Sequence, residues 1–161
     1  MTGAVVRLSR FQAGQGDFLV LNNLHAVETS FLGPEAWERM LDEAHFALCV
    51  EPAAAFLLAF DQDGRYDSPN FVWFKDRYER FVYIDRVIVS AAAQGRGLGK
   101  ALYEYLFAEA RAAGFDVVVC EVNIAPPNPG SVAFHEKLGF VAVGEQAFVN
   151  GKVVRYFERK L

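Results

Sequence analysis

The chain has 161 residues, of which 53% are hydrophobic and 22% are charged. This composition is typical of one globular domain and excludes a disordered or fibrous protein. Its 16 basic and 20 acidic side chains give a formal net charge of −4, which disfavours nucleic acid as a partner because nucleic-acid-binding domains carry basic faces.

The first half of the chain alternates short strands and helices. Apolar residues recur at helical spacing over 15–28, and Pro34 suits the first turn of a second helix. The elements expected here are a strand over 4–8, helices over 15–28 and 34–44, strands over 46–50 and 54–60, a polar loop over 61–70, and a short helical or irregular insert over 70–79.

The second half carries clearer boundary signals. Asn128, Pro129 and Gly139 frame a helix as its cap, first-turn proline and terminating glycine, and Asn150-Gly151 is a strong hairpin turn. The elements expected here are a strand over 81–89, a helix over 98–113, an apolar strand over 115–122, a helix between 128 and 139, and hairpin strands over 140–149 and 152–159.

Cysteine usage and hydropathy limit the chemistry further. Cys49 and Cys120 each lie in an apolar run, so we expect two reduced, buried thiols, with neither a disulfide nor a metal site. No run approaches the roughly 20 apolar residues of a membrane span. The first residues also lack the apolar core of a signal peptide. We therefore expect a cytoplasmic protein without a membrane partner.

The segment VIVSAAAQGRGLGKAL, residues 87–102, joins a β-branched strand to a helix through three glycines at alternate positions. Glycines let successive backbone N–H groups turn toward one point, and the start of a helix adds unpaired N–H groups and the positive end of its dipole. Arg96 and Lys100 add full charges, so the loop suits a pyrophosphate. Ala101 stands where a triphosphate loop needs a hydroxyl for magnesium, and the glycine spacing disagrees with the dinucleotide fingerprint.

The remaining pattern runs from Gln94 through Gly97 to Gly99. Together with the preceding strand, it resembles the pyrophosphate loop of the GNAT family of acyl-CoA-dependent N-acetyltransferases. The resemblance implies a single GNAT-like domain over 1–161 with an α+β fold of the three-layer type. In that fold a mixed central sheet of about six or seven strands is splayed at the cofactor slot and flanked by about four helices.

A second motif downstream also resembles this family. The family pattern is an asparagine, a small residue three positions on, a tyrosine seven on, and Gly-Phe at eleven and twelve. This chain keeps Asn128, Ser131, Gly139 and Phe140, and it places His135 where the tyrosine is usual. The two motifs together cover about residues 81–141.

The resemblance implies transfer of an acetyl group from acetyl-CoA, as co-substrate and without a metal, to a primary amine in a ternary complex. It places the pantetheine arm against the strand before the loop. Asn128 could also be a plain helix N-cap, and the two roles can coexist. The residues implied in cofactor binding are Val87, Ile88, Val89, Gln94, Gly95, Arg96, Gly97, Leu98, Gly99, Lys100, Asn128, Ser131 and His135.

Two proton-handling groups are expected. Strand alternation puts Tyr83, Asp85, Val87 and Val89 on one face, and family members often carry a general base at the positions of Tyr83 or Asp85. We expect Asp85 to take the amine proton, although Asp85 could instead pair with a nearby arginine and only order the slot, or waters could carry the proton. We expect His135 to donate a proton toward the leaving sulfur. The alternative is a surface position near the CoA ribose or adenine.

The acceptor pocket is expected beneath the first two helices and the loop before the signature strand. Polar residues in the first helix could instead be a solvated face, and the aromatic cluster over 66–74 could be a packing insert or a dimer contact. The candidate substrate-binding residues are Asn22, Asn23, Glu28, Tyr66, Trp73 and Asn123.

The leading expectation for the acceptor is a small-molecule amine. A protein N-terminus or a lysine is an alternative acceptor, and a non-catalytic acyl-CoA sensor is the alternative class of protein. Asp85 and His135 together favour an enzyme. The C-terminal hairpin could support a homodimer.

Overall fold

The protein is described here by a computed structural model, which covers residues 3–27 and 29–161. A seven-stranded sheet runs in the order β1-β2-β3-β4-β5-β7-β6, and among its neighbouring strands only β4 and β5 are parallel. The strands are β1 (Val6–Arg7), β2 (Phe46–Val50), β3 (Ala55–Asp61), β4 (Val82–Val89), β5 (Val117–Ala125), β6 (Val141–Ala147) and β7 (Val153–Lys160). The helices are α1 (Gln15–Leu24), α2 (Pro34–Glu43), α3 (Pro69–Lys75), α4 (Leu98–Ala112) and α5 (Pro129–Lys137), with a short 3-10 turn at Ala91–Ala93.

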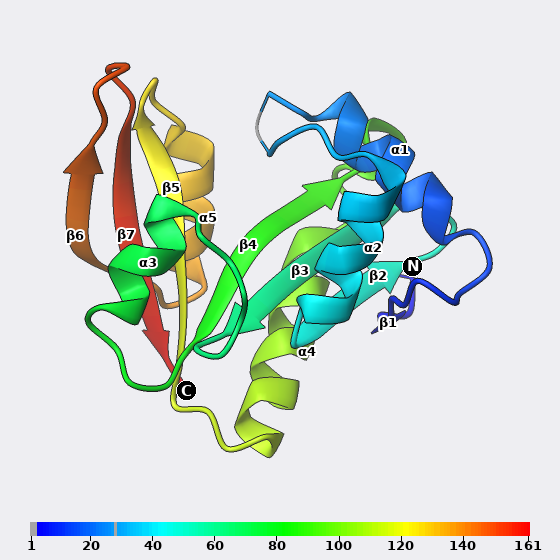
Figure 1. Ribbon diagram of the computed structural model, residues 1–161, viewed down its shortest axis with the longest axis horizontal. Helices are drawn as coiled ribbons and strands as arrows, with labels where there is room; N and C mark the ends of the chain where they lie inside the picture. The colour runs from blue at the N-terminus through cyan, green and yellow to red at the C-terminus, as the bar shows by residue number, and fades with distance from the viewer. Residues whose placement is uncertain (1–2, 28) are drawn as a thin grey trace.

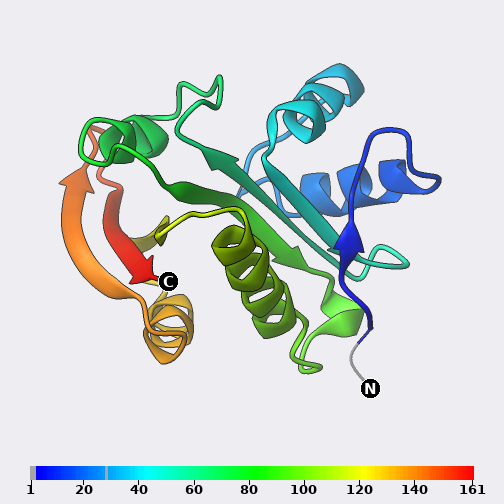
Figure 2. The same cartoon turned by 90° about the horizontal axis from the view of Figure 1, so that it is seen from below.

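The sheet is the middle of three layers (Figures 1 and 2). Helices α1, α2 and α3 lie on one face of the sheet, and α4 and α5 lie on the other. The expected α+β three-layer architecture is confirmed. Five helices flank the described sheet where about four were expected, because the insert over 70–79 contains the helix α3.

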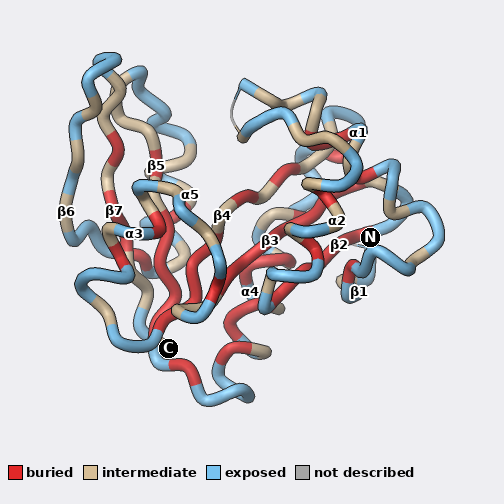
Figure 3. Tube along the Cα trace, viewed as in Figure 1, coloured by how far each residue is buried: buried red, intermediate tan, exposed pale blue. Residues whose placement is uncertain are grey.

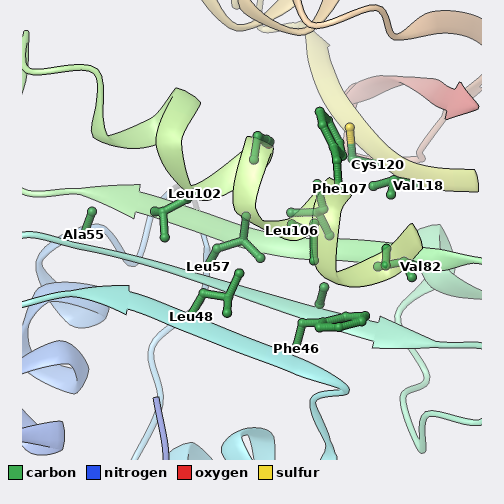
Figure 4. Packing of buried hydrophobic residues seen from close by; sticks show 14 of the residues in the cluster. Phe46, Leu48, Ala55, Leu57, Val82, Leu102, Leu106, Phe107, Val118 and Cys120 are labelled. Carbon is green, nitrogen blue, oxygen red and sulfur yellow. The ribbon is translucent and has the colours of Figure 1, made fainter. Parts of the chain in front are cut away.

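Buried hydrophobic residues gather where α4 crosses the sheet (Figures 3 and 4). Leu102 and Leu106 of α4 are completely buried against Leu48 of β2 and Leu57 of β3. Burying one leucine side chain stabilises a fold by about 1.5–3 kcal/mol, so this seam anchors the helix whose start carries the glycine loop. A second cluster lies under α1 and α2, and a third, rich in aromatic rings, lies under α3.

The parallel pairing of β4 and β5 is very short. Only two register pairs join them, Val82 with Val118 and Tyr83 with Val119. Beyond these pairs the two strands diverge, as Figure 1 shows, while β4 continues to Val89 and β5 to Ala125. The sheet is therefore splayed at its centre, as the family resemblance implies.

A β-bulge at Asp85 corrects the expected strand alternation. Leu58 of β3 pairs with Arg86 and Ala59 pairs with Ile84, so Asp85 is an extra residue in β4. An extra residue inverts the alternation of side chains along the strand. The prediction that Tyr83, Asp85, Val87 and Val89 share one face is wrong. Tyr83 belongs to the cluster under α3, whereas Val87 and Val89 pack on the α4 side.

Most element boundaries agree with expectation, with two differences. The first helix ends at Leu24 rather than at 28, and β5 runs to Ala125, three residues beyond the expected end. The two cysteines are free and buried, as expected. No helix among the described residues is long and apolar enough to cross a membrane.

Candidate active site

A cavity of about 880 Å³ fills the slot between the diverging strands. Its walls come from residues 84–89 of β4, 120–123 of β5, the glycine loop with the first turns of α4, and one side of α5. His25 and Thr29, after α1, and Lys152, between β6 and β7, lie along the same cavity. The slot thus connects the glycine loop to the segments that follow α1 and β6.

The glycine loop forms one end of the cavity. Gly95 and Gly97 have φ angles of 80° and 73°, in the left-handed region that glycine adopts without a steric penalty, and Gly97 is the N-cap of α4. The first turn of a helix leaves backbone N–H groups without intrahelical partners. These N–H groups line the cavity together with Lys100, a combination that suits pyrophosphate oxygens.

All but one of the residues implied in cofactor binding line this cavity. The exception is Arg96, which is exposed and is not among the lining residues. Asn128 accepts a hydrogen bond from the Ser131 backbone N–H at 3.3 Å, so it caps α5 and also faces the cavity. Both roles that the sequence left open for Asn128 are therefore compatible with its position.

His135 is buried rather than on the surface of α5. Its Nδ1 lies 2.7 Å from the Ser131 carbonyl oxygen, which can only accept, so Nδ1 carries the hydrogen. Its Nε2 lies 2.8 Å from the hydroxyl of Tyr103 and accepts from it. Burial lowers the pKa of His135, which keeps the ring neutral. Both ring nitrogens are thus engaged, and Tyr103, on the cavity wall, carries the hydroxyl hydrogen.

Asp85 lies in the cavity wall, but it is paired. Its Oδ2 accepts a hydrogen bond from Arg86 Nε at 2.6 Å, and both side chains are almost completely buried. Arg86 also donates to Asn22 Oδ1 at 2.9 Å and to Ser30 Oγ at 3.3 Å. This arrangement matches the alternative in which Asp85 pairs with an arginine and orders the slot.

Glu121 was not among the residues expected from the sequence. It lies on β5, two residues past the last β4–β5 pair, and lines the cavity. The Tyr83 hydroxyl lies 2.9 Å from each of its carboxylate oxygens, and Asn70 Nδ2 donates to Oε1 at 3.1 Å. The signal that could have identified it is a single carboxylate within the apolar run VVVCEV.

The ionisation of Glu121 is strongly perturbed. Burial, reinforced by the negative charge of Asp85, raises its pKa from 4.5 to about 7, although the hydrogen bonds from Tyr83 and Asn70 act in the opposite direction. A carboxylate with a pKa near neutrality is a stronger base than an ordinary one and is still largely ionised slightly above pH 7. Such groups are suited to general base catalysis.

The comparisons with known proteins address the family. A family model described as "Acetyltransferase (GNAT) family" matches residues 21–140. The chain belongs to the GNAT family of acetyltransferases. The expected family, and with it an acetyltransferase activity that uses acetyl-CoA, is confirmed at the level of the family. The comparison with curated proteins finds no match.

Solved GNAT-like structures share the whole fold at low sequence identity. A ribosomal-protein-alanine N-acetyltransferase from Brucella melitensis has a TM-score of 0.73 at 18% identity, covering 98% of this chain and 99% of that chain. A Salmonella typhimurium protein, solved with its cofactor acetyl-CoA, has a TM-score of 0.72 at 19% identity. The match covers 100% of this chain and 95% of that chain. An aminoglycoside 6'-N-acetyltransferase complexed with coenzyme A has a TM-score of 0.71 at 14% identity, and the match covers 98% of this chain and 96% of that chain. At these identities the likeness concerns the fold alone.

Two of the acceptor-site candidates in this GNAT chain hold the segment after α1. Asn22 is fully buried and donates to the Ser30 carbonyl at 2.9 Å, while the Asn23 side chain bonds both backbone groups of Leu32. These side chains therefore hold the backbone at Ser30 and Leu32, and neither is among the residues that line the cavity. Glu28 lies outside the described residues.

The other candidates divide between the cavity and the aromatic cluster. Asn123 lines the cavity. Tyr66 stacks on Phe60 with ring centroids 4.9 Å apart, and Trp73 stacks on Tyr156 at 4.1 Å. Neither Tyr66 nor Trp73 is among the lining residues. The packing alternative for the 66–74 cluster therefore describes their positions.

Proposed function

We propose that the protein transfers the acetyl group of acetyl-CoA to a primary amine by direct attack within a ternary complex. One observation carries this proposal: Glu121, a carboxylate whose pKa is raised to about 7, lies in the cavity wall where β4 and β5 separate. The glycine loop lies along the same cavity and supplies N–H groups for the pyrophosphate. The glycine loop, which suits the cofactor, and the proposed base therefore line the same cavity.

The first proton transfer is assigned to Glu121. An alkylammonium with a pKa of about 10 must lose a proton before its nitrogen can attack. The ionised carboxylate takes this proton, directly or through a water molecule, and the neutral amine then forms the N–C bond with the thioester carbonyl. Asp85 is less suited to this step because Arg86 holds it in a buried pair. Asp85 and Arg86 instead order the wall of the slot.

The second proton transfer concerns the sulfur. When the C–S bond breaks, the CoA sulfur leaves as a thiolate and needs a hydrogen bond or a proton. The Tyr103 hydroxyl is proposed to supply it by turning its single hydrogen from His135 Nε2 to the sulfur, since neutral His135 has its Nδ1 hydrogen committed to the Ser131 carbonyl. This division of labour modifies the expectation that His135 itself donates. The amide nitrogen loses its second proton to solvent, and the proton held by Glu121 returns through solvent to the Tyr103 phenolate. The net products are the amide, the CoA thiol and one proton.

The acceptor is proposed to be a small amine with an apolar body. Arg86 neutralises Asp85, which leaves the carboxylate of Glu121 to attract an ammonium group in this part of the slot. The segments that reach the cavity through His25, Thr29 and Lys152 also carry highly exposed apolar side chains. These are Val27, Phe31 and Val149.

The test is release of free CoA from acetyl-CoA across a panel of amines. The panel contains arylalkylamines, aliphatic diamines, aminoglycosides and short peptides with free N-termini. The proposal expects turnover with apolar primary amines, and it expects Glu121→Gln to lower kcat/KM by about 10²–10⁴-fold. Turnover confined to the peptides would favour a protein N-terminus as acceptor. Tight acetyl-CoA binding without turnover of any amine would favour the sensor alternative.

A further inference from the structure

A chain of side-chain hydrogen bonds leads away from Glu121 on the side opposite the glycine loop. Asn70 Nδ2 donates to Glu121 Oε1 at 3.1 Å, and the Tyr156 hydroxyl donates to Asn70 Oδ1 at 2.8 Å. The Tyr156 hydroxyl also lies 2.8 Å from Gln146 Oε1, a second acceptor. We propose that Asn70, held by Tyr156, is a positioning residue that fixes the orientation and the protonation state of Glu121. This inference rests on the proposed role of Glu121 as the base.

The polarity of this chain is determined by its ends. An ionised carboxylate only accepts, so Asn70 must present its NH₂ group to Glu121 and its oxygen to Tyr156. The single hydrogen of the Tyr156 hydroxyl then goes to that oxygen, with Gln146 Oε1 as the competing acceptor. The Asn70 amide and the Tyr156 hydroxyl thus both donate toward Glu121, and such an arrangement stabilises the negative charge at its end.

Aromatic packing holds this chain in place. Trp73 of α3 stacks on Tyr156 with a centroid distance of 4.1 Å and an interplanar angle of 19°, and Phe74 meets Tyr156 edge-on at 5.1 Å. A Cβ atom at Gly144 of β6 would lie 2.6 Å from Trp73, so this position needs glycine for the stack to form. Since Asn70 lies in the first turn of α3, packing of α3 against β7 also sets the position of the Asn70 amide.

The ionisable groups around Glu121 explain why the Asn70 amide affects its protonation. The ionisable groups that act on or respond to Glu121 are Tyr83 and Asp85 of β4, Cys120 of β5, Tyr103 of α4 and Tyr156 of β7. Of these, Asp85 raises the pKa of Glu121, while the hydrogen bonds from Tyr83 and Asn70 lower it. Asn70 is thus one of two neutral side-chain donors that, with a backbone hydrogen bond, oppose burial and the charge of Asp85.

The experiment follows the carboxyl carbon of Glu121 by NMR in glutamate-labelled protein, with Glu121→Gln used to assign the signal. Asn70→Ala removes a hydrogen bond to the ionised carboxylate, so it should raise the pKa of Glu121 by about 1. The acid limb of the kcat/KM profile should move to higher pH by the same amount. Activity at pH 6 should therefore fall about tenfold, while activity at pH 9 stays near that of the unaltered protein.

Two more variants keep the test independent of folding defects. Asn70→Asp preserves the side-chain size and adds a second carboxylate, so it should raise the pKa of Glu121 further. Tyr156→Phe keeps the stack with Trp73 but loses the hydroxyl, and it should shift the titration in the same direction by less. The matched control is Tyr78→Phe, which removes a hydroxyl bonded to Glu158 at 2.6 Å and should leave the Glu121 titration unchanged.

The two readouts separate the inference from the function it rests on. A Glu121 signal that titrates identically in Asn70→Ala, Asn70→Asp and the unaltered protein overturns the positioning role. A titration that moves while the rate profile stays fixed supports the positioning role and removes Glu121 as the base. The NMR measurement needs no acceptor amine, so it can be made whichever acceptor the protein uses.

Discussion

The hydroxyl of Tyr83 lies 2.9 Å from both carboxylate oxygens of Glu121. Tyr83 is the last residue of β4 that pairs with β5, and Glu121 is the second residue of β5 beyond that pairing. Burial beside Glu121 and Asp85 raises the pKa of Tyr83 far above 10, so the phenol remains a donor. Tyr83, expected from the sequence as a catalytic candidate, therefore contacts the proposed base rather than the cavity.

Replacing the base should stabilise the protein at alkaline pH. The pKa of Glu121 rises from 4.5 to about 7 on folding, so between these values the folded state binds the proton and the unfolded state has lost it. The free energy of unfolding consequently falls as pH increases through this window, by up to about 3 kcal/mol. Glu121→Gln should raise Tm at pH 8 by several degrees. The gain should shrink toward pH 4, as measured by calorimetry, and an equal gain at both pH values would contradict this account.

Removing the charge of Asp85 should move the rate profile without abolishing it. Asp85 raises the pKa of Glu121, so Asp85→Asn should shift the acid limb of kcat/KM to lower pH, opposite to Asn70→Ala. If Asp85 were the base, activity would fall at every pH. The substitution leaves Arg86 buried without its partner, which costs about 3–5 kcal/mol. The double variant Asp85→Asn/Arg86→Met should recover stability and keep the shifted profile.

Loss of the Tyr103 hydroxyl should slow turnover but spare cofactor binding. Tyr103→Phe removes the proposed donor to the sulfur, so kcat should fall about tenfold or more. The Kd of acetyl-CoA, measured by calorimetry, should stay close to that of the unaltered protein. Tyr105→Phe on the same helix is the control. If Tyr103→Phe kept full turnover while His135→Phe lost it, the imidazole itself would be the donor.

A methyl group in the glycine loop should weaken cofactor binding. Gly97 has a φ of 73°, and nothing lies within 4 Å of a Cβ built there, so Gly97→Ala acts through the backbone alone. Forcing an L-residue into the left-handed region costs about 1–2 kcal/mol. The acetyl-CoA Kd should increase several-fold and Tm should fall. Gly16→Ala, in α1 with equally open space and an ordinary φ, should leave both unchanged or raise Tm slightly.

The cofactor end of the site could be predicted because its signals are local. The glycine loop, the cap at Asn128 and the terminating Gly139 each depend on a few consecutive residues, and the structure places them as the patterns imply. The order of strands and helices follows from hydropathy periods in the same way. The largest departures are the end of the first helix, where Leu24 and Val27 are exposed, and the end of β5, which runs to Ala125.

Glu121 could not be singled out from the sequence because its environment is assembled from distant segments. Glu121 sits in an apolar strand, and its raised pKa comes from burial and from Asp85, 36 positions earlier. The alternation of side chains along β4 does not reveal the bulge at Asp85 either, because the bulge arises from one more residue in β4 than in the facing part of β3. Reading β4 as a regular strand placed Asp85 and Val87 on one face and favoured Asp85 over a carboxylate on β5.

Because only two residue pairs join β4 and β5, the sheet has unpaired strand edges in its interior as well as at its two outer strands. Beyond Tyr83 and Val119, each of these strands presents backbone N–H and C=O groups to the slot instead of to a neighbour. This interior edge lies within the fold, with α4 and α5 on one face of the sheet. It can accept an extended chain that carries its own amides, as pantetheine does. Amide hydrogens along these edges should therefore exchange quickly in the free protein and slowly once acetyl-CoA occupies the slot.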